Sequence, residues 1–277
     1  MSRSGVTEHS QELISHYKGL ARSYTLPEFA AGYDSFRPSP PKVLLDMLCH
    51  VADAEVPALV VDLGSGTGLS TRAWAERARE VVGIEASEEM RAQAERATDA
   101  KNVRYVHAFA QETGLPDSCT DLVTCSQSFH WMDHVSVLEE ASRILRPGGV
   151  FAAYDYDWPP VFQWEVERAF GEMVRRVGMR RAREGQPRHT KDMHLERMKE
   201  SGHFRFVREV VFHSRERGDA ERILGMAFSL GPVVMLLDEG TSEEELGVAD
   251  LREVVARSIG DAEVELFVCY RARLGVL

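Results

Sequence analysis

Short apolar runs alternate with amphipathic stretches along the first 155 residues. Runs that we interpret as buried strands cover about residues 58–63, 80–85, 103–107, 121–126 and 149–155. The stretches around them, such as 41–51 and 70–79, repeat apolar positions at helical spacing. Strands that alternate with helices are typical of a parallel sheet covered on both faces. The pattern therefore predicts a doubly wound α/β domain.

The second half of the chain follows a different pattern. Two β-rich runs, residues 204–214 and 264–273, are expected to complete the sheet, whereas residues 156–202 and 216–261 are mainly helical. Additions of this kind can cover the carboxyl ends of the strands, where ligands bind in such folds. We expect four segments: an N-terminal cap segment (1–40), a core (41–155), a helical cap insertion (156–202), and residues 203–277 with the last two strands and the insertion 216–261.

A strand that runs into a glycine-rich turn is the most informative motif. Residues 60–68 read Val-Val-Asp-Leu-Gly-Ser-Gly-Thr-Gly, and a predicted helix follows them. Glycine permits positive φ and close approach of a ligand, and the turn presents backbone N–H groups at a helix N-terminus. Counted from Gly64, the glycines occupy positions one, three and five, whereas the dinucleotide fingerprint requires one, three and six. Asp62, two positions before Gly64, also disfavours a nearby pyrophosphate.

This motif resembles motif I of the class I S-adenosylmethionine (SAM)-dependent methyltransferases. Residues 81–87, 110–126 and 145–151 resemble later segments of the same superfamily, in the same order. The resemblance implies a Rossmann-like, doubly wound sheet of seven strands with helical cap insertions, the last strand lying antiparallel beside the fifth. It also implies S-adenosyl-L-methionine as cofactor and S-adenosylhomocysteine as product.

The resemblance also implies which residues bind the cofactor. Asp62 anchors the loop or reaches the amino group of SAM, Glu85 accepts the ribose hydroxyls, and the backbone N–H of Ala110 meets an adenine ring nitrogen. Phe109 stands where many relatives have Asp, so Gln111 or Glu112 is the alternative acceptor for the adenine amine. Ser87 is expected to cap the following helix. The expected cofactor-binding residues are Arg37, Asp62, Gly64, Ser65, Gly66, Gly68, Glu85, Ala86, Met90, Ala110, Gln111 and Ser126.

Residues 33–41 are similar to the Tyr-x-x-x-Arg-Pro-x-Tyr-Pro segment of a subgroup that includes trans-aconitate-type methyltransferases. The resemblance implies that Arg37 binds the SAM carboxylate through its guanidinium fork. The alternative is a surface arginine that holds the loop. Pro40 replaces the second tyrosine of the subgroup, which leaves Tyr33 or Tyr24 as a residue that closes over the site.

Residues 126–133, after the fourth strand, are similar to a Gln-x-Phe-His-Trp-x-Asp string of the same subgroup, at the mouth of the methyl-transfer site. His130 is either a general base, a residue that orients the substrate, or a structural histidine. The aromatic residues beside it, and those at the exit of the fifth strand, either line the substrate or pack against neighbouring helices. The expected substrate-lining residues are Tyr33, Gln127, His130, Trp131, Tyr154 and Trp158, with His130 as the catalytic candidate.

Composition narrows the possible partners. The net charge of −11 argues against a general polynucleotide binder, and no stretch has the length and hydropathy of a membrane span. The four cysteines show no metal or Cys-x-x-Cys spacing, and the Asp and His residues show no metal-ligand spacing. We therefore expect a cytoplasmic protein without metal, monomeric or homodimeric. A basic cluster is expected to be a solvated helix face, with an anionic substrate site as the alternative: Arg175, Arg176, Arg180, Arg181, Arg183, Arg188 and Lys191.

The favoured function is therefore SAM-dependent methylation of a small organic molecule at oxygen or nitrogen. Two alternatives remain: an NAD(P)-dependent oxidoreductase on a Rossmann sheet, and a SAM-binding protein without catalysis. A nucleic-acid methylase would normally carry an Asn/Asp-Pro-Pro-aromatic motif after the fourth strand, and this chain has Ser-Gln-Ser-Phe there.

Overall fold

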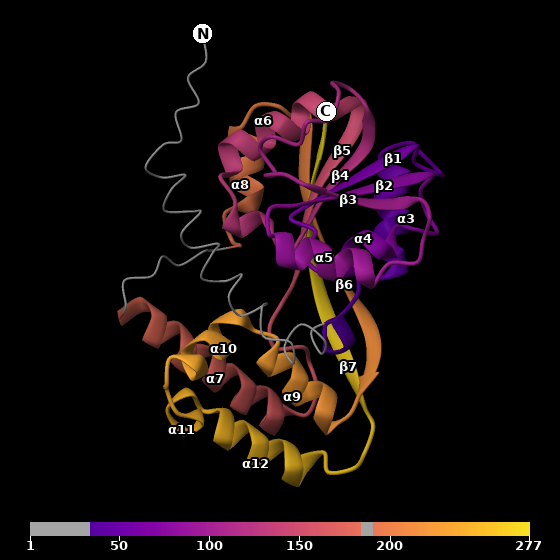
Figure 1. Ribbon diagram of the computed structural model, residues 1–277. Coiled ribbons are helices and arrows are strands. Elements are labelled where there is room, and N and C mark those ends of the chain that lie inside the picture. The colour runs from indigo at the N-terminus through magenta and orange to yellow at the C-terminus, as the bar shows by residue number, and fades with distance from the viewer. Residues whose placement is uncertain (1–33, 184–190) are drawn as a thin grey trace.

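The computed structural model describes residues 34–183 and 191–277. Figure 1 shows an upper lobe built around a sheet and a lower lobe of helices. The strands are β1 (Leu59–Leu63), β2 (Glu80–Glu85), β3 (Val103–His107), β4 (Thr120–Ser126), β5 (Leu145–Tyr156), β6 (Phe206–Gly218) and β7 (Val264–Val276). The helices are α3 (Lys42–Val51), α4 (Leu69–Ala73), α5 (Glu88–Arg96), the 3₁₀ turn η1 (Phe129–Trp131), α6 (His134–Ile144), α7 (Trp164–Arg183), α8 (His194–Glu200), α9 (Ala220–Phe228), α10 (Gly231–Asp238), α11 (Glu243–Leu246) and α12 (Val248–Ser258).

Within the described part of the chain, the sheet has seven strands in the order β3-β2-β1-β4-β5-β7-β6. Strands β1 to β5 pair in parallel, and β7 pairs antiparallel with both β5 and β6. This confirms the predicted Rossmann-like sheet with its last strand antiparallel beside the fifth. The strand order changes direction between β1 and β4, and ligands of open α/β sheets bind beyond the strand ends at such a point.

Helices cover both faces of the sheet because its central strands are apolar on both sides. On one face, Leu44 and Leu48 of α3 and the buried Trp74 pack against β1, β2 and β5. On the opposite face, Leu138 of α6 and Met198 of α8 pack against the same strands. Figure 1 shows α3, α4 and α5 on one side of the sheet and α6 and α8 on the other.

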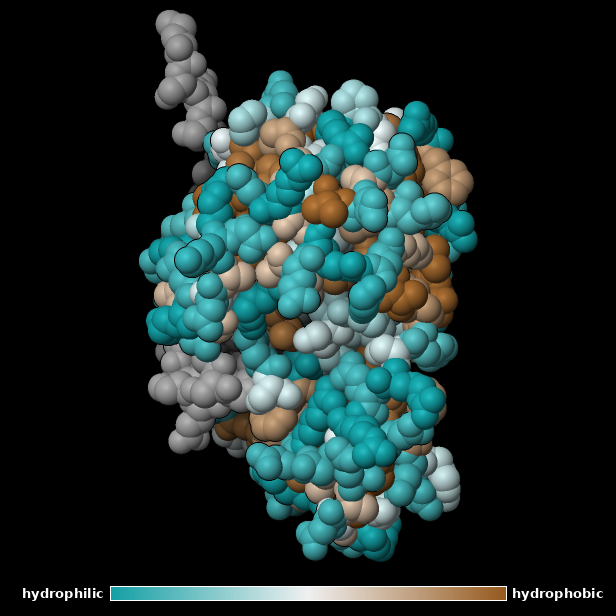
Figure 2. All heavy atoms as spheres, turned by 90° about the vertical axis from the view of Figure 1, so that its right-hand side faces the viewer, coloured by the Kyte–Doolittle hydropathy of each residue, from teal (hydrophilic) through white to brown (hydrophobic). Residues whose placement is uncertain are grey.

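A second core holds the lower lobe together. Apolar side chains of α7, α9, α10 and α12 form one buried cluster, which includes Phe170, Met226 and Leu251. On α7, Val166, Phe170, Met173 and Val177 are buried against this cluster, and Val174 is partly buried. β6 and β7, each 13 residues long, extend from the upper lobe to this cluster (Figure 1). The surface is largely hydrophilic where Figure 2 shows it.

Two local predictions differ from the structure. The helix expected over 70–79 ends at Ala73, and single turns stabilised by hydrogen bonds to Thr71, Arg72 and Trp74 continue the chain.

α8 lies within the expected cap insertion 156–202 but packs on the sheet beside α6 and β6. The reason is the buried Met198, which joins the apolar cluster of the sheet and not that of the lower lobe.

Among the described residues, no single helix is long and apolar enough to cross a membrane. α9 and α10 pass that test only when taken together, as a pair bent by 73°. All four cysteines carry free thiols.

Candidate functional site

The glycine turn follows β1 at the point where the strand order reverses. Gly64, Gly66 and Gly68 adopt φ values of 66°, 58° and 83°, which residues with a Cβ rarely adopt. The backbone N–H groups of Gly64 and Ser65 both donate to the carbonyl of Ile84, at 2.8 and 3.0 Å. These two bonds hold the turn against the end of β2.

Glu85, the last residue of β2, faces this turn. One of its carboxylate oxygens accepts from the Gly66 N–H and the other from the Ser87 N–H, both at 2.8 Å. The residue is 6% exposed, and burial raises the pKa of the carboxyl while the backbone donors oppose that rise. A carboxylate has about four acceptor positions, so these two bonds leave capacity for a further donor.

Asp62 holds the base of the turn. Its two oxygens accept from the hydroxyls of Thr71 on α4 and Thr124 on β4, each at 2.7 Å. The side chain is fully buried, and desolvation raises the pKa of Asp62 to about 6. Of the two predicted roles, the contacts support the one in which Asp62 anchors the loop.

The turn leaves no room for a Cβ at Gly64 or Gly68, where it would overlap Met132 and Tyr105. A Cβ on Gly66 would lie 3.1 Å from the Met90 methyl, which is a tight contact. Met90 belongs to α5, which Ser87 caps as predicted. A turn with three glycines beside a buried carboxylate fits the methionine and ribose portions of SAM. The residues that would hold them are Glu85, Met90 and the three glycines.

The expected adenine segment forms a tight turn after β3. Phe109 pairs with Glu112 across the turn, so Ala110 and Gln111 occupy its two central positions. Ala110 is buried, whereas Gln111 and Glu112 are exposed. Ala86 accepts a bond from His107 at its carbonyl, which ties the end of β2 to β3. The adenine contacts themselves stay predictions.

Arg37 makes hydrogen bonds within the protein, and its role at the SAM carboxylate stays a prediction. Its guanidinium donates to the hydroxyl and carbonyl of Ser229 and to the Tyr156 hydroxyl, and it lies 5.5 Å from the ring centre of Trp158. These residues belong to the exit of β5 and the turn after α9. Arg37 thus joins the N-terminal segment to the cap, which is the structural alternative. Tyr33 and Tyr24 lie outside the described residues.

Asp34 contacts the glycine turn instead. Its carboxylate accepts from the Thr67 hydroxyl and from Arg72, whose guanidinium also donates to the Thr67 carbonyl at 2.6 Å. Sequence reasoning missed this residue because its partners are 33 and 38 positions away.

The turn after β4 lies directly beside the glycine turn. Ser128 donates from its hydroxyl to the Leu63 carbonyl at 2.8 Å, and Met132 contacts Gly64 as described above. Gln127 adopts a positive φ of 55°, and its N–H donates to the Tyr154 carbonyl. The predicted residues Ser126, Gln127, His130 and Trp131 are therefore brought next to the expected cofactor site.

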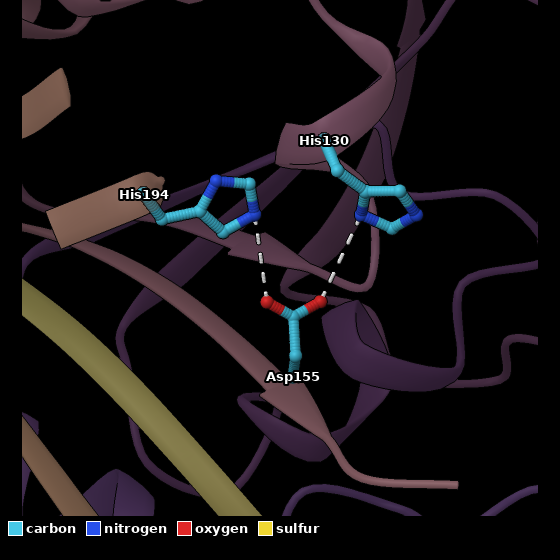
Figure 3. A group of neighbouring side chains, drawn as sticks. All are labelled: His130, Asp155 and His194. Carbon is cyan, nitrogen blue, oxygen red and sulfur yellow. Dashed lines mark ion pairs between the residues drawn. The ribbon is translucent and has the colours of Figure 1, made fainter. Parts of the chain in front are cut away.

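A buried group of charges adjoins this turn, centred on Asp155 of β5. Figure 3 shows His130 and His194 on either side of the Asp155 carboxylate. His130 Nδ1 lies 3.8 Å from Oδ1, and His194 Nε2 lies 3.6 Å from Oδ2. Lys191 Nζ is 3.2 Å from Oδ1, and Arg273 of β7 is 3.2 Å from Oδ2.

Electrostatics set the charge states in this group. Burial opposes ionisation of Asp155, yet the charges of Lys191 and its neighbours outweigh it and lower the pKa of that carboxyl. Burial lowers the pKa of His194 to about 4, so this histidine is neutral at pH 7. Asp155 therefore carries its negative charge next to one neutral histidine.

Tyr154 and Trp158, both expected to line the substrate, pack against other parts of the protein. Tyr154 was expected to line the substrate, but it is 1% exposed and its hydroxyl bonds to Ser70 at 2.6 Å in the core. The error arises because the β5 side chains alternate, and Tyr154 points into the apolar cluster shared with α3. Trp158 stacks on Phe170 of α7 with ring centres 5.8 Å apart, which seats the cap.

Two arginines of the basic cluster, both on α7, pair with acids. Arg175 and Arg176 contact Glu172, and Arg176 also contacts Asp250 of α12. These contacts agree with the expected solvated helix face. Lys191 is the exception, because it leaves the cluster and reaches Asp155 and the Gln127 side chain. Arg188 lies outside the described residues.

Comparison with known proteins agrees with this geometry. Residues 61–153 match the family model described as a methyltransferase domain. An uncharacterized methyltransferase of Mycobacterium bovis is 36% identical over 117 residues, 42% of this chain and 46% of that protein. A probable S-adenosylmethionine-dependent methyltransferase of Saccharomyces cerevisiae is 30% identical over 135 residues, 47% of this chain and 46% of that protein. The chain thus spans about half the length of these curated relatives.

Among solved structures, one named a putative type II methyltransferase from Anaeromyxobacter dehalogenans has a TM-score of 0.64 and 26% identity. The similarity covers 87% of this chain and 98% of that one. In fold, glycine turn and matched residues the chain is similar to class I SAM-dependent methyltransferases, and residues 61–153 are the part that matches the methyltransferase domain.

Proposed function

We propose that this chain transfers the methyl group of SAM to an oxygen or nitrogen of a small organic molecule. The observation that carries the proposal is the position of Glu85. Its buried carboxylate lies at the end of β2, accepts from Gly66 at 2.8 Å and keeps acceptor capacity for a ribose. SAM, when bound, supplies an electrophilic methyl carbon on a sulfonium.

The chain's own residues then bind and orient the reactants. Glu85 and the glycine turn hold the nucleoside end, and Asp62 keeps the turn rigid through Thr71 and Thr124. Holding two reactants in line contributes up to about 7–11 kcal/mol to the rate in favourable cases. Gln127, His130 and Trp131 lie beside the glycine turn, where the acceptor would have to approach.

A small acceptor is favoured over a polynucleotide by the charge of the chain. The net charge of −11 does not favour a polynucleotide substrate.

The test is a methyl-transfer assay with SAM and a panel of phenols, enols, amines and carboxylates, which measures formation of S-adenosylhomocysteine. We expect turnover with at least one acceptor class, and none in the Gly66→Arg variant. If SAM binds but every acceptor class leaves it intact, the chain is a SAM-binding protein without this catalysis. If NADH binds and SAM does not, the proposal fails entirely.

A further inference from the structure

The group around Asp155 is more elaborate than binding of SAM requires. It brings together side chains from four parts of the chain: η1, β5, the segment before α8 with α8 itself, and β7. The members are His130, Asp155, Lys191, His194 and Arg273, and their contacts all converge on one carboxylate. Burying such a group is costly unless its members are paired, so a function for it is expected.

The two oxygens of Asp155 have different partners. Oδ2 faces Arg273, which Glu209 also holds at 2.8 Å, and the fully buried His194. These contacts fix the carboxylate from the side of the sheet. Oδ1 faces His130 at 3.8 Å and Lys191 at 3.2 Å, the two members next to Gln127 and the glycine turn. One oxygen is therefore held by the scaffold and the other is directed at the candidate site.

The orientation of His130 completes this arrangement. Figure 3 shows one ring nitrogen of His130 toward Asp155 and the other directed away from it. A carboxylate at Nδ1 favours the tautomer that has its proton there, which makes Nε2 the basic atom. The 3.8 Å separation is longer than a hydrogen bond, and such contacts often shorten when a substrate binds.

We propose that Asp155 is a positioning residue that prepares His130 as the general base of methyl transfer, and that Lys191 weakens this base by competing for the same carboxylate oxygen. This inference rests on the proposed function. It also narrows the acceptor to a nucleophile that carries a proton near neutral pH, such as a hydroxyl or an ammonium group.

The chemical step balances without another reagent. The acceptor's proton passes to Nε2 of His130, and a lone pair of the acceptor forms the new bond to the methyl carbon. The electron pair of the broken sulfur–carbon bond stays on sulfur. The resulting imidazolium faces Asp155, whose negative charge stabilises it.

A metal site is the competing interpretation of the same side chains. Ligand atoms of His130, Asp155 and His194 lie within 4.8 Å of one another. However, Lys191 and Arg273 each place a positive charge 3.2 Å from the carboxylate, one at each oxygen. A divalent cation would have to enter against both charges, so the geometry favours the positioning role.

The experiment measures the pKa of His130 directly, by NMR titration of its imidazole signals, and therefore does not depend on knowing the acceptor. Replacing Asp155→Asn removes the negative charge, and we expect the pKa of His130 to fall by about one unit or more. Replacing Lys191→Met removes the competing charge, and we expect the pKa of His130 to rise. The matched control is Asp157→Asn, which should leave the pKa of His130 unchanged. Asp157 lies two residues after Asp155 and forms a half-exposed ion pair with Arg271.

Lys191→Met keeps the test valid if Asp155→Asn does not fold, because Lys191 is partly exposed and outside the core. An unchanged His130 pKa in a folded variant of either kind would overturn the proposal, whatever the activity. Joint shifts of the His130 and His194 signals with stoichiometric Zn²⁺ would also overturn it, in favour of a metal site. With an acceptor found, Asp155→Asn should lower kcat about 10- to 100-fold and move the acidic limb of its pH profile, with SAM affinity unchanged.

Discussion

Replacing Glu85→Gln tests the cofactor site with little change in shape. In the native protein both carboxylate oxygens accept from backbone N–H groups, of Gly66 and Ser87, at 2.8 Å. Glutamine has only one side-chain oxygen, so its NH₂ group must face one of these donors. At 6% exposure, water cannot easily replace the lost acceptor. We expect the variant to lose about 1–3 kcal/mol of unfolding free energy without ligand.

The effect on SAM is separate. The native carboxylate would accept charge-assisted bonds from the ribose, each worth about 1.5–3 kcal/mol. Loss of one such bond raises the dissociation constant about 10- to 150-fold, since about 1.4 kcal/mol corresponds to a factor of ten. Calorimetric titration with SAM measures the change in the dissociation constant. Denaturant unfolding measures the loss of unfolding free energy.

Glu88→Gln is the matched control, because Glu88 lies three residues further on, is exposed, and pairs with Arg91 on the surface of α5. This variant should change neither the unfolding free energy nor the dissociation constant of SAM by more than a small amount. A Glu85→Gln variant that is folded and binds SAM as tightly as the native protein would refute the assignment of Glu85 to the ribose.

Three further predictions follow from individual contacts. Gly66→Arg should abolish SAM binding in calorimetry while circular dichroism shows a folded protein, because its side chain would meet Met90 and fill the cofactor's place; retained affinity would contradict the role of the turn. Arg37→Ala should lower the melting temperature by loosening the N-terminal segment from the cap at Ser229 and leave SAM affinity within about twofold; a loss of affinity of tenfold or more would support its predicted role at the SAM carboxylate. His194 has a pKa of about 4 in the fold against 6.5 when exposed, so the unfolded chain binds the extra proton in this range. The native protein should therefore lose about 3 kcal/mol relative to His194→Gln as pH falls from 6.5 to 4; parallel stability curves for the two proteins would show that His194 is not buried as a neutral group.

The sheet and the glycine turn were predictable because their signals are local. Apolar runs bounded by turn residues locate β1, β2, β4 and β5, and the spacing of the glycines after β1 distinguishes a SAM loop from a dinucleotide loop. Glu85 follows from the same logic, since it ends the strand next to the turn. Each of these features lies within a few residues of the pattern that reveals it.

The group around Asp155 was not predictable in the same way. Arg273 lies 118 residues from Asp155, and no periodicity links them until β7 pairs with β5. Lys191 was assigned to a surface cluster on charge alone, although it reaches Gln127 and Asp155. His194 sits on a helix that was expected in the cap and packs on the sheet instead. Long-range packing, which the sequence pattern does not encode locally, determined all three.

Arg37 illustrates a limit of resemblance. The sequence around it matches a subgroup segment, but its guanidinium has Ser229 and Tyr156 as hydrogen-bond partners and Trp158 as a ring contact. Tyr156 and Trp158 lie at the exit of β5, and Ser229 follows α9 in the cap. These partners lie up to 192 positions from Arg37, so the segment around Arg37 could not reveal them.

The most direct test of the central claim is calorimetric titration of the purified chain with SAM, S-adenosylhomocysteine and NADH side by side. The account predicts saturable, micromolar binding of both adenosyl ligands and no binding of NADH. Binding of NADH without SAM would contradict the assignment of the glycine turn, and with it the roles given to Glu85 and its neighbours.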